Sequence, residues 1–212
     1  MIQTPFGRLM LIYGDIVSKT LVEGNHWNPH VFNALIPYLR GTVIDVGANV
    51  GALTMRFAKW APQVVAYEPH PVLAACLRWN MKTLELKNVQ IVEEGVYSKS
   101  VYLAPRDDGD CPSSWSWLPA AEGGVFAGRG VFSGPAWVDS PVSAIKVDAQ
   151  GADLHALLGL RKVIERDHPK IVFEFERPVS LLHGHDWKDY EEQLHRWGYT
   201  IKDIGEGDWF CG

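Results

Sequence analysis

The chain has 212 residues, of which 47% are hydrophobic and 21% are charged, a balance typical of a folded globular protein rather than a disordered or membrane protein. A chain of this length can bury about 70% of the surface that its unfolded form exposes, so a single domain over 1–212 needs no metal or disulfide to fold. Twenty basic and 25 acidic residues give a net charge of −5. Such a charge provides no broad field for polyphosphates, so we expect no nucleic-acid partner.

The cysteines and the first residues indicate a compartment. The three cysteines are odd in number and have no zinc-ligand spacing, which favours a reducing environment. The start of the chain lacks the basic head and apolar run of a signal peptide, and no apolar stretch approaches the roughly 20 residues of a membrane span. We therefore expect a cytoplasmic protein without a membrane partner.

In chain order, residues 1–40 form a lead-in, with a predicted hairpin over 7–16 and a helix over 29–39 that we expect to cap the ligand cleft. From residue 42 onward, short apolar runs alternate with amphipathic segments, a pattern typical of a parallel sheet covered on both faces. The predicted strands lie at 42–46, 63–67, 89–93, 143–148, 170–176, 199–204 and 207–211. The predicted helices lie at 51–60, 71–84, 151–166 and 186–197. The short link before the last strand predicts a hairpin, and hence one antiparallel strand.

The segment 104–142 sustains no period and is rich in Pro, Gly, Ser and Trp. A compact domain rarely keeps so long an irregular loop unless it binds a ligand or moves, so we expect a substrate-side loop. Its tryptophans Trp115, Trp117 and Trp137 either stack on a flat acceptor such as a sugar ring or anchor the loop to the body. The sequence favours neither reading.

The first core strand leads into a glycine turn, from Asp45 to Gly51, that opens a helix. Gly47 and Gly51 would let the backbone approach a ligand, and free amides at the helix start would face the cleft. A dinucleotide site needs a further glycine where Asn49 stands, because a side chain there crowds the pyrophosphate. The motif therefore predicts a nucleotide without phosphates, and S-adenosylmethionine (SAM) is such a cofactor.

Two acids suit the parts of that cofactor. Asp45 is expected to accept a hydrogen bond from the methionine ammonium, directly or through water. Glu68 ends the second strand and is expected to accept both ribose hydroxyls, as the acid of a dinucleotide site does. Both acids could instead be mere strand-end caps. Ala48, Pro69 and Glu94 complete the predicted cofactor-binding set.

These residues, together with the segment Ile145 to Asp153, resemble the FkbM family of methyltransferases. Asp153 departs from the family's usual Glu, and Asn28 replaces a frequent acid of the entry region. The resemblance implies an α/β, Rossmann-like class I methyltransferase, with a seven-stranded, mostly parallel sheet that has one antiparallel strand and helices on both faces. It also implies methyl transfer from SAM to a hydroxyl, usually on a sugar or natural product. The expected partner is thus a small-molecule acceptor such as a carbohydrate or glycoside.

Four residues at or near the ends of the fourth and fifth strands are candidates for a role in catalysis. Asp148 and Glu174 are placed to accept the proton of a hydroxyl, and Glu176 is a further candidate. Lys146 lies on the same strand face as Asp148, so the two either serve the reaction or form a structural ion pair.

A histidine segment follows the fifth strand. His183 is predicted to act in catalysis or substrate contact, although a surface loop is equally compatible with its position. His183 and His185 have a spacing that metals use, but no third ligand is near in sequence, so we expect no metal. His155 is expected at the edge of the core, and Asp153 is expected to cap a helix.

Three other functions stay open. The same fold could serve as a binding protein without catalysis. An NAD-dependent oxidoreductase is disfavoured by Asn49, and a nitrogen methyltransferase by the absence of an Asn/Asp-Pro-Pro-Tyr/Phe motif. The sequence does not specify the acceptor or the oligomeric state, and an oligomer is compatible with it.

Overall fold

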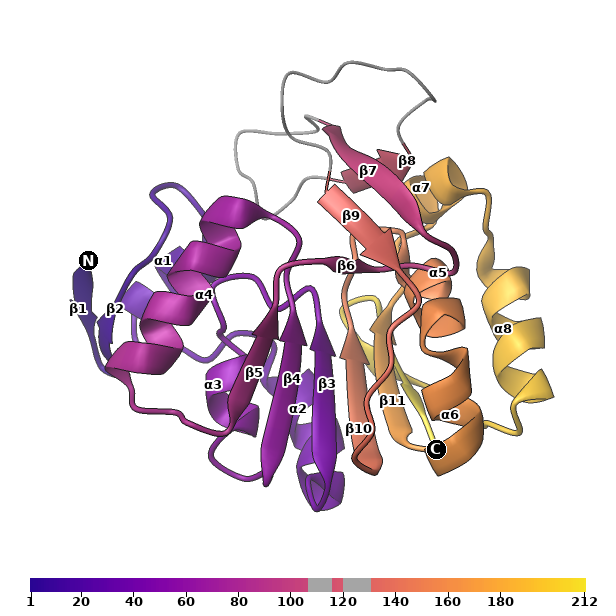
Figure 1. Cartoon of the computed structure of the whole chain (residues 1–212), viewed down its shortest axis with the longest axis horizontal. Helices are drawn as coiled ribbons and strands as arrows, with labels where there is room; N and C mark the ends of the chain where they lie inside the picture. Colours follow the sequence, from indigo (N-terminus) through magenta and orange to yellow (C-terminus); the bar gives the residue numbers. More distant parts are fainter. Residues whose placement is uncertain (107–115, 120–130) are drawn as a thin grey trace.

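A computed structural model describes residues 1–106, 116–119 and 131–212 (Figure 1). Its main sheet has seven strands in the order β12-β13-β11-β10-β3-β4-β5. In chain order the strands are β3 (Thr42–Val46), β4 (Gln63–Tyr67), β5 (Val89–Val92), β10 (Val142–Val147), β11 (Lys170–Glu174), β12 (Ile201–Gly205) and β13 (Asp208–Cys211). β13 is antiparallel to both of its neighbours, whereas the other pairs are parallel. The predicted fold class is confirmed.

Helices cover both faces of this sheet (Figure 1). One face carries α2 (Pro29–Leu35), α3 (Thr54–Phe57) and α4 (Pro71–Thr83). The other face carries α5 (Asp153–Gly159), α6 (Arg161–Asp167) and α8 (Trp187–Arg196). Val43 and Ile44 are adjacent and both fully buried, one in each of the two cores, because successive strand residues point to opposite faces. The central strands are therefore apolar on both sides, as a covered parallel sheet requires.

Where one helix was expected over 151–166, the structure has α5 and α6, separated at Leu160. The carbonyl of Gly159 accepts a hydrogen bond from the amide of Ala136 (3.1 Å). A Cβ atom on Gly159 would lie 2.5 Å from the carbonyl oxygen of Tyr97. The backbone at Tyr97 and Ala136 thus contacts the end of α5, and local periodicity in the sequence does not reveal such a contact between distant parts of the chain.

The lead-in differs from its prediction. A hairpin forms earlier than the expected 7–16, from β1 (Ile2–Thr4) and β2 (Gly7–Leu9). It is followed by an unpredicted helix, α1 (Ile16–Val22), whose N-cap Asp15 accepts a hydrogen bond from the Ser18 amide (2.7 Å). Asp followed by a short apolar-periodic run is a recognisable helix start, so the sequence carried this signal. The predicted helix over 29–39 becomes α2 and a 3₁₀ turn, η1 (Ile36–Tyr38).

The segment expected to be irregular contributes to a second sheet, in the order β6-β9-β7-β8. Its strands are β6 (Gly95–Val96), β7 (Val101–Arg106), β8 (Ser116–Pro119) and β9 (Val131–Gly134). Figure 1 shows this sheet beyond the carboxyl ends of the parallel strands. The predicted stacking role of Trp115 lies outside the described residues. Among the residues that are described, no helix has the length and hydropathy needed to cross a bilayer.

Candidate functional site

The backbone amides of the turn after β3 are hydrogen-bonded within the protein. All five consecutive amides from residue 47 to 51 donate to acceptors within the protein. They are Gly47 and Ala48 to the Tyr67 carbonyl, Asn49 to Glu68 Oε2, Val50 to Asn49 Oδ1 and Gly51 to the Ala48 carbonyl, at 2.6 to 3.0 Å. The expected free amides are therefore absent from this turn. A pyrophosphate needs such donors, so the geometry supports a phosphate-free ligand for a reason beyond the side chain of Asn49.

The glycines of the turn pack against protein atoms. Gly47 has φ +71°, and a Cβ atom there would lie 1.8 Å from the carbonyl oxygen of Asp148. Gly51 has φ +93°, and its Cβ atom would lie 2.7 Å from Leu77 Cδ1. These glycines were expected to let a ligand come close. At both positions the close approach is made by another part of the chain.

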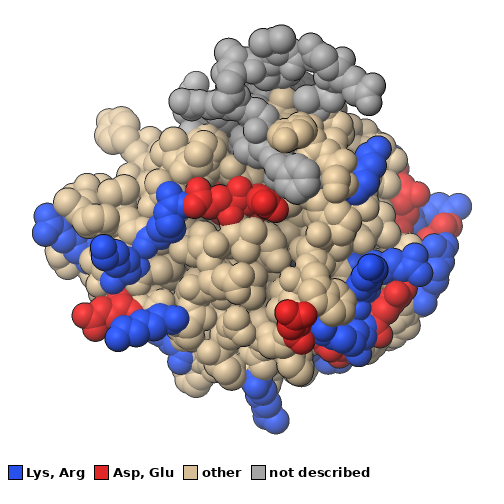
Figure 2. Space-filling model, in the orientation of Figure 1, with Lys and Arg blue, Asp and Glu red and all other residues tan. Residues whose placement is uncertain are grey.

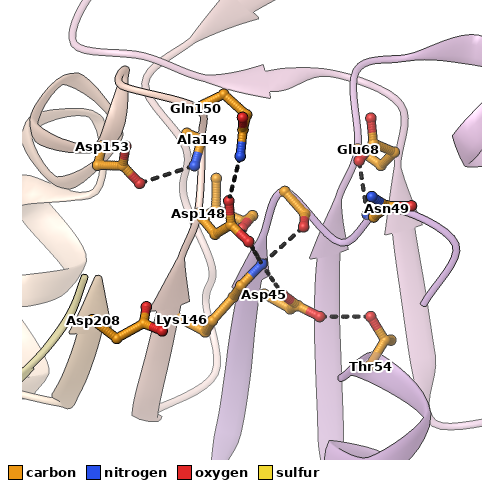
Figure 3. A network of polar contacts seen from close by, with 12 residues as sticks. Asp45, Asn49, Thr54, Glu68, Lys146, Asp148, Ala149, Gln150, Asp153 and Asp208 are labelled. Atoms are coloured by element: carbon orange, nitrogen blue, oxygen red, sulfur yellow. Dashed lines mark hydrogen bonds and ion pairs between the residues drawn. The ribbon is translucent and has the colours of Figure 1, made fainter. Parts of the chain in front are cut away.

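Glu68 is buried and held by two backbone amides, of which Figure 3 shows that of Asn49. Its Oε2 accepts from Asn49 and its Oε1 from His70, both at 2.8 Å. Burial raises the pKa of Glu68 to about 7, although these two hydrogen bonds and Lys146 oppose the shift. The carboxyl is thus fixed in orientation and poised between its two charge states near neutral pH.

A cavity lies at the carboxyl ends of β3 and β4. It is lined by Val46, Gly47, Asn49, Tyr67, Glu68, Pro69, Leu73, Gly95, Val96, Leu103, Asp148, Ala149, Gln150 and Ala152. Four predicted cofactor residues are in this lining: Gly47, Asn49, Glu68 and Pro69. Open α/β sheets bind ligands at this edge, so we call this space the cofactor cavity.

A second cavity adjoins the first and shares lining residues with it. It is lined by Ile16, Val17, Trp27, Gly47, Ala48, Asn49, Ala52, Leu53, Lys146, Asp148, Gln150 and Glu174. Gly47, Asn49, Asp148 and Gln150 line both spaces and so mark their junction. The lead-in supplies one wall of this second cavity, through α1 and Trp27. Two ligands, one bound in each cavity, would meet beside Asp148.

Three predicted cofactor residues, Asp45, Gly51 and Glu94, line neither cavity. Asp45 is fully buried and lies below the junction (Figure 3). Its Oδ2 accepts from Thr54 Oγ1 (2.6 Å), and its Oδ1 lies 3.3 Å from Lys146 Nζ. In this structure the carboxylate of Asp45 therefore faces Lys146, and its contact is with the protein.

Lys146 joins the two loops at the junction. Its Nζ donates to the carbonyls of Val46 (3.0 Å) and Gly47 (2.8 Å) and lies 3.6 Å from Asp148 Oδ2. Burial lowers the pKa of Lys146, but the carboxylates of Asp45 and Asp148 outweigh burial, so its net pKa is raised. Lys146 is thus a permanent buried cation. The alternative of a structural ion pair fits these contacts.

The two predicted carboxylates differ in environment. Asp148 is partly exposed, and its Oδ1 accepts from Gln150 Nε2 (3.1 Å). The charge of Asp148, followed by burial, raises the pKa of Glu174 to about 10. Burial and the neighbouring carboxylates therefore favour the protonated form of Glu174. Glu176, the third candidate, is exposed at the N-cap of α7 (Arg177–Ser180) and lines neither cavity.

Asp153 supports the turn that carries Gln150. Its two carboxylate oxygens accept from the amides of Ala149 (2.9 Å) and Gly151 (3.0 Å). Gln150 and Gly151 have φ values of +50° and +89°, so the turn needs such support. Asp153 caps the loop before α5, a supporting role close to the one expected.

His183 lines neither cavity. It ends the 3₁₀ turn η3 (Leu181–His183), and its ring centroid lies 6.0 Å from that of His155. His155 also contacts His185, at 4.6 Å between centroids. Burial lowers the pKa of His183 and His155 to about 4. Among the described residues no group of three or more ligands is arranged to hold a metal. His183, which was predicted to act in catalysis, thus lies in a cluster of three histidines whose pKa values are lowered by burial.

Comparisons with known proteins agree with this geometry. The family model "Ribosomal RNA adenine dimethylase" matches residues 17–111. FkbM methyltransferase of Methylobacillus flagellatus superposes with a TM-score of 0.54 at 18% identity, over 82% of this chain and 44% of that one. SMU.1697c of Streptococcus mutans, solved in complex with S-adenosylhomocysteine (SAH), superposes with a TM-score of 0.54 at 14% identity, over 85% and 93%. The chain thus shares the fold of these methyltransferases.

One expectation is wrong. A protein of Methanosphaera stadtmanae named "Probable ribosomal RNA small subunit methyltransferase A" is 31% identical over 74 residues, which are 35% of this chain and 27% of that protein. This match and the family model both point to relatives that act on RNA, against the expectation that no nucleic acid is involved. Net charge was a poor guide, because it averages over the surface and does not describe a local contact region. The chain spans about a quarter of the curated relative's length.

Proposed function

We propose that this chain is a SAM-dependent methyltransferase of the FkbM type that methylates a hydroxyl on a sugar or natural product. The observation that carries the proposal is the junction of two cavities at Asp148, with Glu68 in one and Lys146 and Glu174 in the other. SAM supplies a methyl group on a sulfonium and leaves as a neutral thioether. The chain's residues must bind it, align the acceptor and take up one proton.

The cofactor cavity suits the nucleoside end. An ionised Glu68, already oriented by Asn49 and His70, would accept hydrogen bonds from a ribose diol. Apolar Pro69, Leu73 and Val96 line the same cavity and suit an adenine ring. The reactive end would then lie toward the junction and the acids there.

The second cavity suits the acceptor. Its walls include the apolar residues Ile16, Val17 and Leu53 and the indole of Trp27, and its floor holds Asp148. Methyl transfer is an in-line displacement, and holding the reactants in line can contribute about 7 to 11 kcal/mol. Asp148 is the base in this proposal because it lines both cavities and is partly exposed, whereas burial and neighbouring carboxylates favour a proton on Glu174. A hydroxyl that is methylated must lose its proton, and a carboxylate such as that of Asp148 can accept it.

Methylation of nitrogen in RNA is a second candidate, favoured by the family match over 17–111. That match covers the cofactor half, from α1 to β7, and ends before β10 brings Lys146 and Asp148. RNA would be held by basic side chains. On the face shown in Figure 2, these lie along the margins, with an acidic strip near the centre.

The test begins with calorimetry of the full chain and SAM, for which we expect micromolar affinity. Methyl-labelled SAM is then offered with a panel of glycosides and, separately, with small-subunit ribosomal RNA. Label in a glycoside supports the first candidate, and label recovered as methyladenine supports the second. Asp148→Asn should lower turnover by about 10² to 10⁴-fold with SAM affinity unchanged. Failure to bind SAM would refute both candidates.

A further inference from the structure

A row of polar groups leads from the cavity junction toward the surface, and its outer half was not predicted from the sequence. Asp148 lies at the junction and Glu174 on the floor of the second cavity. Asp208 is directly opposite Glu174 in the antiparallel pair of β11 and β13, so both side chains lie on one face of the sheet. His30, at the start of α2, places Nε2 2.7 Å from Asp208 Oδ2 and Nδ1 3.7 Å from Oε2 of the exposed Glu206. The side chain of His30 is 21% exposed and so reaches solvent.

This row carries an excess of acids. Glu174 faces Asp148 and Lys146 from β10, Asp153 from α5 and Asp208 from β13, and Glu176 follows it in the chain. Figure 3 shows Asp208 pointing toward the side chain of Lys146. Lys146 is the buried cation of this group, and it is already paired with Asp45. The carboxylates cannot all be ionised together unless a further positive charge enters.

In the cofactor-free protein, protonation of Glu174 and Asp208 reduces the repulsion among these carboxylates. Asp148 is the largest cause of the raised pKa of Glu174. Burial raises the pKa of Asp208 to about 6, even though its hydrogen bond with His30 lowers it. A cation that arrived at the junction would stabilise the ionised carboxylates and thereby release a proton.

We propose that the Glu174–Asp208–His30 row releases one proton to solvent when the positively charged SAM binds and regains one when methyl transfer removes that charge. In this proposal Asp208 and His30 are positioning residues for the reaction. The inference rests on the proposed function. Binding of the sulfonium favours the ionised form of Glu174, and the proton leaves to solvent, which the row reaches at the partly exposed His30. During transfer the carbon–sulfur bond breaks, a carbon–oxygen bond forms, and the hydroxyl proton passes to Asp148 and then to Glu174. The site thus regains its proton as the cofactor loses its charge.

The test is calorimetry of the full chain with SAM and with SAH at about pH 7, each in phosphate and in Tris buffer. The two buffers differ in ionisation enthalpy, so the difference in measured heat counts the protons exchanged. We expect SAM to release up to about one proton more than SAH does, because only SAM carries the sulfonium charge. Equal proton counts for the two ligands would overturn the inference while leaving the proposed function intact. Absence of SAM binding would overturn both.

Three variants locate the effect. Glu174→Gln should abolish the difference between SAM and SAH, since it removes the group that exchanges the proton. His30→Ala should move the pH profile of proton release upward, because Asp208 loses the partner that favours its ionised form. His195→Gln, a change at an exposed histidine of α8, should leave the profile unchanged. A profile that His30→Ala and His195→Gln affect equally would remove His30 from the row.

Discussion

The carbonyl oxygen of Asp148 lies 1.8 Å from the position that a Cβ atom on Gly47 would take. The loops after β3 and β10 therefore meet at a contact that admits only glycine. Lys146 donates to the carbonyl of Gly47 in the same region, so one buried cation and one missing side chain hold the two loops together. The geometry of the cavity junction depends on this contact.

Gly47→Ala should destabilise the protein by at least about 3 kcal/mol and weaken SAM binding, because the loops must separate. Gly14→Ala is a matched control, since Gly14 has a similar φ of +80° but no atom within 4 Å of the added Cβ. It should cost only the backbone strain, about 1 to 2 kcal/mol. Urea unfolding of the two variants measures the difference, and equal losses would mean that backbone strain alone explains Gly47.

Glu68→Gln should weaken SAM binding about tenfold or more. The amide would keep one acceptor oxygen but turn an NH₂ group toward the amide of Asn49 or of His70, which now donate to the carboxylate. Because burial raises the pKa of Glu68 to about 7, the variant should also show a smaller rise in affinity between about pH 6 and pH 8 than the wild type.

Glu94→Gln is the comparison for Glu68. Glu94 was predicted to bind the cofactor, but it lies outside the lining of both cavities. We expect a change in SAM affinity of less than about twofold, a difference below about 0.5 kcal/mol. A loss as large as that of Glu68→Gln would restore Glu94 to the cofactor site.

Lys146→Met should cost about 3 to 5 kcal/mol of stability, because it leaves the fully buried Asp45 without its cation. Adding Asp45→Asn should recover part of that loss. Lys188→Met removes an exposed lysine 3.5 Å from Glu192 and should cost no more than about 1 kcal/mol. Thermal or urea unfolding of the single and double variants measures these values, and a double variant no more stable than Lys146→Met would argue against the pairing.

His183→Leu should stabilise the protein by about 1 to 3 kcal/mol, because neither buried ring nitrogen has a hydrogen-bond partner among the described residues. Burial lowers the pKa of His183 from 6.5 to about 4, so the unfolded chain binds more protons in that range. Stability is therefore lost as pH falls from about 6.5 to about 4, and the variant should lose less. Unfolding curves across this range test the prediction, and a steeper acid loss in the variant would contradict it.

The sequence by itself determined the strands of the main sheet and the glycine turn after β3. Strand positions follow from local apolar periodicity, and β3 and β4 lie at the predicted residues. Gly47, Asn49 and Glu68 were recognisable because a turn after a strand and an acid after the next strand are spaced along the chain in a fixed way. Such features need no knowledge of distant residues.

Only the tertiary structure decided which side chains face the cavities. Asp45 was expected to meet the cofactor, and its buried carboxylate lies 3.3 Å from the ammonium of Lys146, 101 residues later, and lines neither cavity. Asp208 and His30 are 178 residues apart and carried no joint signal. The direction of a side chain at a strand end is set by its neighbours on other strands and helices. These neighbours come from distant parts of the sequence, so their charges and contacts act only once the sheet has formed.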